Sequence, residues 1–262
     1  MEILLHKMFT KLEKQVEYTL KSESGLIKMN DLIGQNIELN FSQKTKCKSC
    51  HKISNKLFAQ GFCYSCFISV PEAAECIIKP ELCKAHLGEG RDVEWEKKHH
   101  LQPHIVYFAV ASSLKVGVTR DTQVPTRWID QGASFAIKIA ETPYRQLAGE
   151  IEVALKSSFT DKTNWRRMLK NEIADFDLEE EKWKLEELLP TDLSQYMCED
   201  DEIFEINYPV LEFPEKVKSV GFDKIPSIKG KLLGIKGQYL LLDNDRVLNI
   251  RKHEGYYVDF NF

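Results

Sequence analysis

The sequence contains no apolar run of about 18 residues, the length needed for a membrane-spanning helix. Its first stretch, MEILLHKMFTKLEKQ, is too charged for a secretory signal peptide. It also has no P-loop, no GxGxxG motif and no internal repeat, and its serines and histidines form no triad-like grouping. We therefore expect a cytoplasmic protein without membrane contact, and the common nucleotide-binding and triad-hydrolase classes are excluded.

The net charge is small, −4, but the charged residues are unevenly distributed. Residues 99–170 hold 10 Lys and Arg against 6 Asp and Glu, a net charge of +4. Residues 171–213 hold 2 Lys against 15 Asp and Glu, a net charge of −13. The basic stretch is compatible with a nucleic-acid partner and equally with an ordinary solvated surface.

The acidic stretch predicts a helical linker over residues 176–200 whose charged side chains face water. An alternative is that this segment covers a basic groove until a substrate displaces it. The apolar side chains expected to be partly buried in the linker are Leu178, Trp183, Leu185, Leu188 and Leu189.

Seven cysteines are present, and four of them form two Cys-x2-Cys pairs. Such pairs in a cytosolic protein indicate metal binding before they indicate disulfides. Two short turns of this kind bring four thiolates within reach of one tetrahedral zinc ion, as in a zinc ribbon or a treble-clef turn. We therefore predict a structural zinc site formed by Cys47, Cys50, Cys63 and Cys66.

A second group of sulfur and nitrogen ligands follows in residues 71–102. Two cysteines and two histidines supply the mixed donor set that zinc accepts, although their spacing is irregular. The alternatives are His99 as the fourth ligand, or two buried cysteines beside surface histidines. The predicted second zinc site consists of Cys76, Cys83, His86 and His100.

Both ends of the chain are rich in predicted strands. Apolar residues alternate with polar ones around Tyr18 and Leu39, which is typical of half-buried strands. Four short apolar runs near the C-terminus are separated by turn residues. Because isolated strands are marginally stable, we expect the two ends to combine in one small β-barrel-like module. The C-terminal runs are Lys231–Ile235, Tyr239–Leu242, Val247–Ile250 and Tyr256–Phe260.

The central stretch, His104–Leu169, has a different pattern. Two apolar runs separated by Ser112 and Ser113 predict a tight hairpin, and a short helix with Arg127 follows. A third apolar run, Ala133–Ala140, precedes a longer helix predicted to begin at Thr142 and Pro143 and to end near Phe159. The expected order is strand, strand, helix, strand, helix.

That order resembles the core of the GIY-YIG nucleases. In that family a tyrosine ends the first strand, a Tyr-Ile-Gly triplet opens the second, the next helix presents an arginine, and a glutamate on the following helix binds one divalent metal ion. The triplet here is Lys115, Val116 and Gly117, so Lys115 stands in the place of the second tyrosine. The resemblance implies a catalytic set of Tyr107, Lys115, Arg127, Glu152 and Asn164, with Glu152 as the ligand of Mg²⁺ or Mn²⁺.

A resemblance that covers nearly the whole chain rests on the words KVGVTR, PTRWIDQGA and DKTNWR, together with the Cys-rich segment before them. These words resemble the bacterial family termed domain of unknown function 2797. The family implies no particular activity.

The sequence thus predicts an α+β fold with a GIY-YIG-like core, a zinc-binding segment and a terminal β module. The expected function is that of a zinc-containing, nucleic-acid-acting protein, specifically a divalent-metal-dependent phosphodiesterase. The alternative is a non-enzymatic zinc protein that binds nucleic acid or a protein partner on the same core. The expected segments are 1–42 (β), 43–102 (zinc-binding), 103–175 (core), 176–200 (acidic linker) and 201–262 (β).

Overall fold

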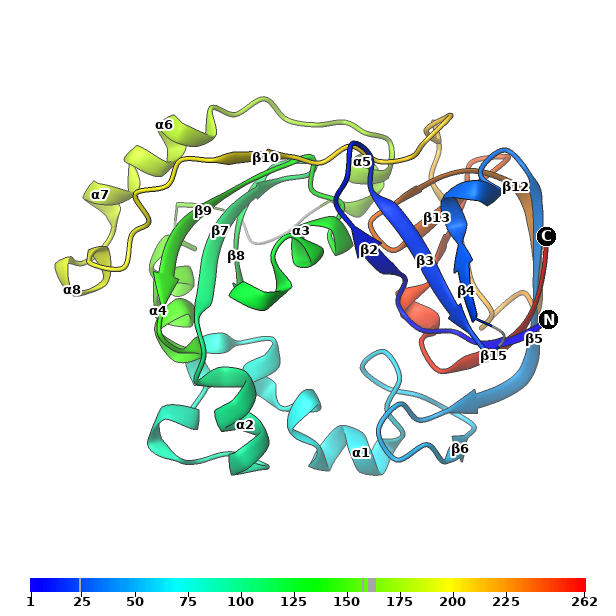
Figure 1. The fold of residues 1–262 in the computed structure, drawn as a ribbon, viewed down its shortest axis with the longest axis horizontal. Coiled ribbons are helices and arrows are strands. Elements are labelled where there is room, and N and C mark those ends of the chain that lie inside the picture. The colour runs from blue at the N-terminus through cyan, green and yellow to red at the C-terminus, as the bar shows by residue number, and fades with distance from the viewer. Residues whose placement is uncertain (24, 157, 160–163) are drawn as a thin grey trace.

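The computed structural model describes residues 1–262 except 24, 157 and 160–163. The fold is α+β, with three sheets and short helices (Figure 1). A sheet built from both chain ends and a central four-stranded sheet lie at opposite ends of the molecule, and the Cys-rich segment runs along one side from the first to the second. This side is where segments far apart in the sequence meet.

The terminal sheet has eight strands, and its centre is β5 (Asn36–Lys46), which pairs with β15 on one edge and β12 on the other. The prediction that the two ends of the chain combine is therefore confirmed. The barrel-like closure is wrong: among the described residues the sheet stays open, with β1 and β11 at its edges. The other strands are β1 (Glu2–Leu4), β6 (Ile53–Ser54), β11 (Lys218–Val220), β12 (Ser227–Lys236), β13 (Tyr239–Leu242), β14 (Arg246–Asn249) and β15 (Tyr256–Asn261).

A small three-stranded sheet covers the inner face of the terminal sheet. It consists of β2 (Phe9–Lys11), β3 (Glu17–Ser22) and β4 (Gly25–Lys28), followed by the 3-10 helix η1 (Met29–Leu32). Its alternating apolar residues enter one hydrophobic core that also contains side chains of the terminal and central sheets. Burial of these apolar side chains explains why such short strands are stable in this protein.

The central sheet has the order β10-β9-β7-β8. The predicted hairpin is confirmed as β7 (His104–Val110) and β8 (Leu114–Arg120), and the third run is β9 (Phe135–Thr142). β7 is buried along its whole length because its side chains alternate between two hydrophobic cores. β10 (Ile203–Glu205), placed by sequence in the C-terminal module, instead pairs with β9 as an edge strand.

Two helices flank the central sheet in the predicted order, α3 (Thr126–Asp130) and α4 (Arg145–Leu155). The N-cap of α4 is Tyr144, two residues after the predicted cap at Thr142, because Thr142 is still paired with His104 in the sheet. Ala148, Ile151 and Leu155 of α4 pack in the same core as the outer-face side chains of β7. The opposite side of α4 is also covered: a Cβ on Gly149 would lie 2.1 Å from the backbone nitrogen of Glu81, so this position must be glycine for the Cys-rich segment to dock.

The Cys-rich segment contains α1 (Tyr64–Ser69) and α2 (Val93–His100), joined by a chain of 3-10 turns. These turns pack against α4 and carry the segment from the terminal sheet to the central one (Figure 1). Short 3-10 turns contribute few regular hydrogen bonds, so side-chain clusters are needed to fix this path. The turns are η2 (Pro71–Ala73), η3 (Glu75–Ile77), η4 (Pro80–Leu82) and η5 (Ala85–Leu87).

The acidic linker forms α6 (Leu178–Trp183), α7 (Leu185–Leu188) and α8 (Thr191–Ser194) on the outer side of the central sheet. Leu178, Leu185 and Leu189 join the core beneath α4, as expected. Trp183 and Leu188 differ: they are 61% and 42% exposed, because the short helices α6 and α7 turn them to solvent. The remaining elements are α5 (Trp165–Leu169) and the 3-10 turns η6 (Asp121–Gln123) and η7 (Arg251–His253).

Candidate metal sites and a basic cleft

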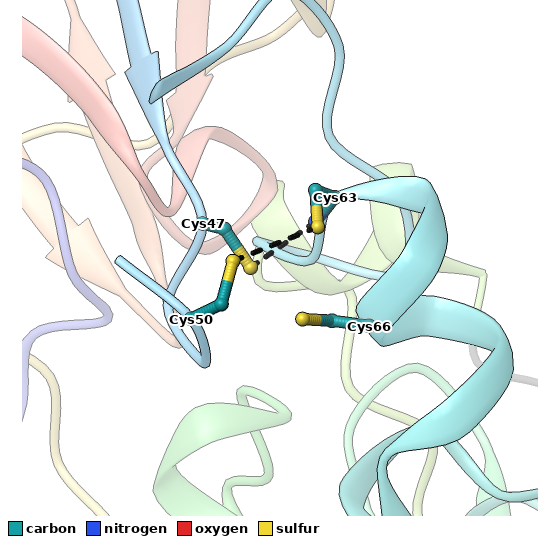
Figure 2. A group of neighbouring side chains, drawn as sticks. All are labelled: Cys47, Cys50, Cys63 and Cys66. Atoms are coloured by element: carbon teal, nitrogen blue, oxygen red, sulfur yellow. Dashed lines mark hydrogen bonds between the residues drawn. The ribbon is translucent and has the colours of Figure 1, made fainter. Parts of the chain in front are cut away.

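The first cysteine cluster is formed where the terminal sheet meets the Cys-rich segment. Cys47 directly follows β5, and Cys50 lies on the turn after it. Cys63 caps the N-terminus of α1, and Cys66 lies in the first turn of that helix. The four sulfur atoms point toward one another and lie within 4.8 Å of one another (Figure 2).

Backbone hydrogen bonds hold the two turns together. The amide of Lys48 donates to the carbonyl of Gly61 at 2.8 Å, and the amide of Cys63 donates to Cys47 Sγ at 3.2 Å. Burial raises the pKa of Cys47, but hydrogen bonds from the amides of Cys63, Cys50 and Ser49 outweigh it and lower that pKa to about 6. Amides directed at sulfur favour the thiolate form that metals bind.

The sulfur spacing suits zinc. Two sulfur ligands of a tetrahedral zinc lie roughly 3.8 Å apart when each Zn–S bond is about 2.3 Å. The distance from Cys50 Sγ to Cys63 Sγ is 3.8 Å. The four-cysteine cluster is therefore compatible with one zinc ion.

The second predicted group is brought together in part. The donor atoms of Cys76, Cys83 and His100 lie within 4.8 Å of one another, and all three side chains are buried. His86 lies elsewhere: its exposed ring stacks on Tyr144, with ring centroids 5.1 Å apart. His99, the alternative ligand, stacks on Trp95 and directs Nδ1 at the Trp95 carbonyl, 2.7 Å away.

A cavity of about 520 Å³ lies between the Cys-rich segment, the edge strand β8 and the turn η7. Tyr107, Lys115, Arg127 and Glu152 all line it. Four of the five residues that the GIY-YIG resemblance selects therefore converge on one cleft. They come from β7, β8, α3 and α4, which are separate elements in the sequence.

Asn164, the fifth, is not among the lining residues of this cavity. It caps α5: its side chain accepts a hydrogen bond from the Arg167 amide at 3.3 Å, and its own amide donates to Ser112 Oγ at 3.1 Å. Residues 161–163 of the DKTNWR word lie outside the described residues. Asn164 is thus the N-cap of α5, and its backbone is bound to Ser112 in the turn between β7 and β8.

Tyr107 lies flat across Gly117, its partner in the hairpin. A Cβ at Gly117 would stand 2.7 Å from the Tyr107 hydroxyl oxygen, so only glycine leaves room for the ring. The hydroxyl donates a hydrogen bond to Gln131 Oε1 at 3.1 Å. Burial raises the pKa of Tyr107, while the neighbouring Arg127 acts in the opposite direction, so the phenol is protonated near neutral pH.

Lys115 stands on the same face of the hairpin, two residues from Gly117, and is 7% exposed. Burial, and to a smaller extent the positive charge of Arg127, lowers the pKa of Lys115 to about 7. At neutral pH a substantial fraction of this lysine is therefore the free amine, which can accept a proton.

Glu152 is 9% exposed, and its Oε2 atom is buried without a hydrogen-bond partner. The nearest cation is Lys156, one turn along α4, whose Nζ lies 3.5 Å from that oxygen. Burial raises the pKa of Glu152, and Lys156 acts in the opposite direction. A buried carboxylate oxygen with spare acceptor capacity beside a polar cavity is suited to bind a divalent cation.

The cleft is strongly basic. Six Lys and Arg line it against two acids, Glu72 and Glu152. A smaller adjoining cavity of about 210 Å³ shares Arg127, Arg145 and Arg251 with it. The cations that sequence reasoning missed are Lys48, Arg145, Lys156 and Arg251.

These residues were not predictable because they come from three separate parts of the chain. Lys48 lies in the first cysteine turn, Arg145 and Lys156 at the two ends of α4, and Arg251 in the C-terminal sheet region. Only the tertiary fold makes them neighbours. No signal in the sequence therefore marks them as a group.

Comparison with known proteins places this geometry in a family. The model of the family described as "Protein of unknown function (DUF2797)" matches residues 34–258, so the chain belongs to that family. No curated protein and no solved structure matches it significantly. None of the helices within the described ranges is both long and apolar enough to cross a bilayer.

Proposed function

We propose that this protein is a zinc-containing phosphodiesterase that acts on nucleic acid with the help of a divalent ion. The observation that carries the proposal is the convergence of Tyr107, Lys115, Arg127 and Glu152 on one basic cavity. The order β7, β8, α3, β9, α4 agrees with the GIY-YIG resemblance of the sequence. A basic cleft attracts a phosphate backbone by charge.

Glu152 would hold Mg²⁺ or Mn²⁺, which supplies positive charge to the phosphate and to the leaving oxygen. The free amine of Lys115 accepts a proton from water, and the water oxygen forms a new bond to phosphorus. The bond from phosphorus to the leaving oxygen breaks, and its electron pair stays with that oxygen, which then takes up a proton. Arg127 stabilises the negative charge that develops on the phosphate.

Tyr107 is the other candidate for the base, and the pH dependence separates the two. Lys115 accepts a proton only as the free amine, above its pKa of about 7. Cleavage is therefore expected to rise about tenfold per pH unit below 7 and to level off above it. Lys115→Met is expected to lower the cleavage rate at pH 8 by roughly 100-fold or more. It is also expected to remove the rise of the rate with pH below 7. An unchanged profile in Lys115→Met would assign the base to Tyr107.

Binding to nucleic acid is tested separately through Arg251, which lines both cavities. Arg251→Ala is expected to reduce the slope of log affinity against log salt concentration by about 1, because one phosphate contact is lost. Fluorescence anisotropy with a labelled oligonucleotide measures this slope. Lys14→Ala is the control, since Lys14 is exposed and does not line the cleft. Equal slopes for both variants would place the nucleic-acid surface elsewhere.

A further inference from the structure

The second cysteine cluster contains three buried ligand groups that the proposed cleavage does not use. Cys76, Cys83 and His100 are 8%, 2% and 2% exposed. Cys83 Sγ lies 3.3 Å from His100 Nδ1. A sulfur and a nitrogen ligand of tetrahedral zinc lie roughly 3.5 Å apart, so this pair is already spaced for an ion. A tetrahedral zinc site requires a fourth ligand.

Glu96 lies one turn before His100 on the same face of α2. Its Oε2 atom is 3.9 Å from His100 Nδ1, the same nitrogen that faces Cys83. That distance is too long for a hydrogen bond. It leaves space for an ion contacted by both groups, and a carboxylate that supported the histidine from outside would face Nε2 instead.

Neighbouring backbone groups fix the orientation of the Glu96 carboxylate toward His100. Its side chain is 4% exposed, and Oε1 accepts a hydrogen bond from the Arg91 amide at 2.8 Å. Gly90 closes the other side: a Cβ there would lie 2.3 Å from the carboxylate. Within the described residues, His100 is the one basic side chain within 4.0 Å of Glu96. A buried carboxylate in such a setting is costly unless a cation compensates it.

We propose that Cys76, Cys83 and His100 hold a second zinc ion and that Glu96 completes the site. The donor atoms of the first three lie within 4.8 Å of one another, whereas the Glu96 carboxylate lies outside that group, beside His100, and moves toward the two sulfur atoms when the ion binds. Glu96 replaces His86, the fourth ligand that the sequence predicts. The His86 ring lies outside the cluster and stacks on Tyr144. The ion joins η3, the loop after η4 and helix α2, three pieces that few regular hydrogen bonds connect.

The proposed site also supports the cleft. Arg145 donates to the Cys76 carbonyl from Nε at 3.0 Å and from Nη2 at 2.9 Å, and Nη2 also donates to the Ile77 carbonyl at 2.9 Å. The backbone of a proposed ligand therefore fixes a cation that lines both cavities. In this way the ion helps to set the position of one arginine of the cleft.

Zinc content tests the site without reference to any activity. Full-length protein is purified without chelators, dialysed against a chelator of moderate strength, and its zinc is measured by mass spectrometry. The wild type is expected to retain about two zinc ions per chain, and Cys83→Ser about one. A wild-type value near one, unchanged in Cys83→Ser, would overturn the proposal.

The fourth ligand is tested by three variants. Glu96→Gln and Gly90→Ala are each expected to weaken the second site by on the order of 100-fold, measured by competition with a chromophoric chelator. Gly90→Ala leaves every ligand intact and displaces only the carboxylate, so it serves if Glu96→Gln folds poorly. His86→Ala is the control and is expected to retain two zinc ions. Loss of zinc in His86→Ala, or full retention in both other variants, would remove Glu96 from the site.

Discussion

Glu152→Gln is expected to lower metal-dependent cleavage by roughly 1000-fold or more, because the change removes the one negative charge that would hold the ion in the cleft. The side chain keeps its shape. Because burial raises the pKa of Glu152, its charged form gains little from the folded state at neutral pH. The free energy of unfolding is therefore expected to stay nearly constant, as thermal denaturation will show.

Glu150→Gln is the matched control for this experiment. Glu150 lies on the same helix but does not line the cleft, and it accepts a hydrogen bond from Gln146. It is expected to cleave like the wild type. Equal loss in the two variants, or no loss in either, would show that Glu152 does not hold the catalytic ion.

Cys50→Ser is expected to release one zinc ion and to destabilise residues 43–70, because metal binding at a four-thiolate site contributes folding free energy. A serine hydroxyl stays protonated at neutral pH and is a poor zinc ligand. The loss of local stability is expected to be at least about 3 kcal/mol, measured by amide hydrogen exchange in this segment. The magnitude is large because the ion would bind four cysteines that come from two separate pieces of this segment.

Cys198→Ser provides the control, since Cys198 lies outside both cysteine clusters. It is expected to keep its zinc and its exchange protection. Wild-type protein without zinc would remove the first site from the account altogether, and so would an unchanged zinc content in Cys50→Ser.

Features encoded locally were predictable from the sequence. The hairpin β7–β8 follows from two apolar runs around a short polar turn, and the first cysteine cluster follows from two Cys-x2-Cys spacings. The strands near the C-terminus agree with their predicted ranges to within a few residues. The hairpin, the cysteine turns and the pairs β12–β13 and β13–β14 all join residues close in sequence.

Features that depend on distant contacts were not predictable. β10 pairs with β9 in the central sheet and is not part of the C-terminal β module. The terminal sheet stays open among the described residues. Arg251 reaches the cleft only because the last strands fold back beside the Cys-rich segment. Glu96 illustrates the same limit: the sequence favours His86 as a zinc ligand, whereas the winding of α2 directs Glu96 toward the buried cluster.

The most direct measurement of the central claim is a cleavage assay with wild-type protein. Labelled single- and double-stranded DNA and RNA are incubated with the purified protein at pH 8 in Mg²⁺ or Mn²⁺, with a metal-free control. We expect cleavage of at least one substrate that requires the divalent ion. Salt-sensitive binding without any cleavage would contradict the claim and leave a zinc protein that holds nucleic acid on a nuclease-like cleft.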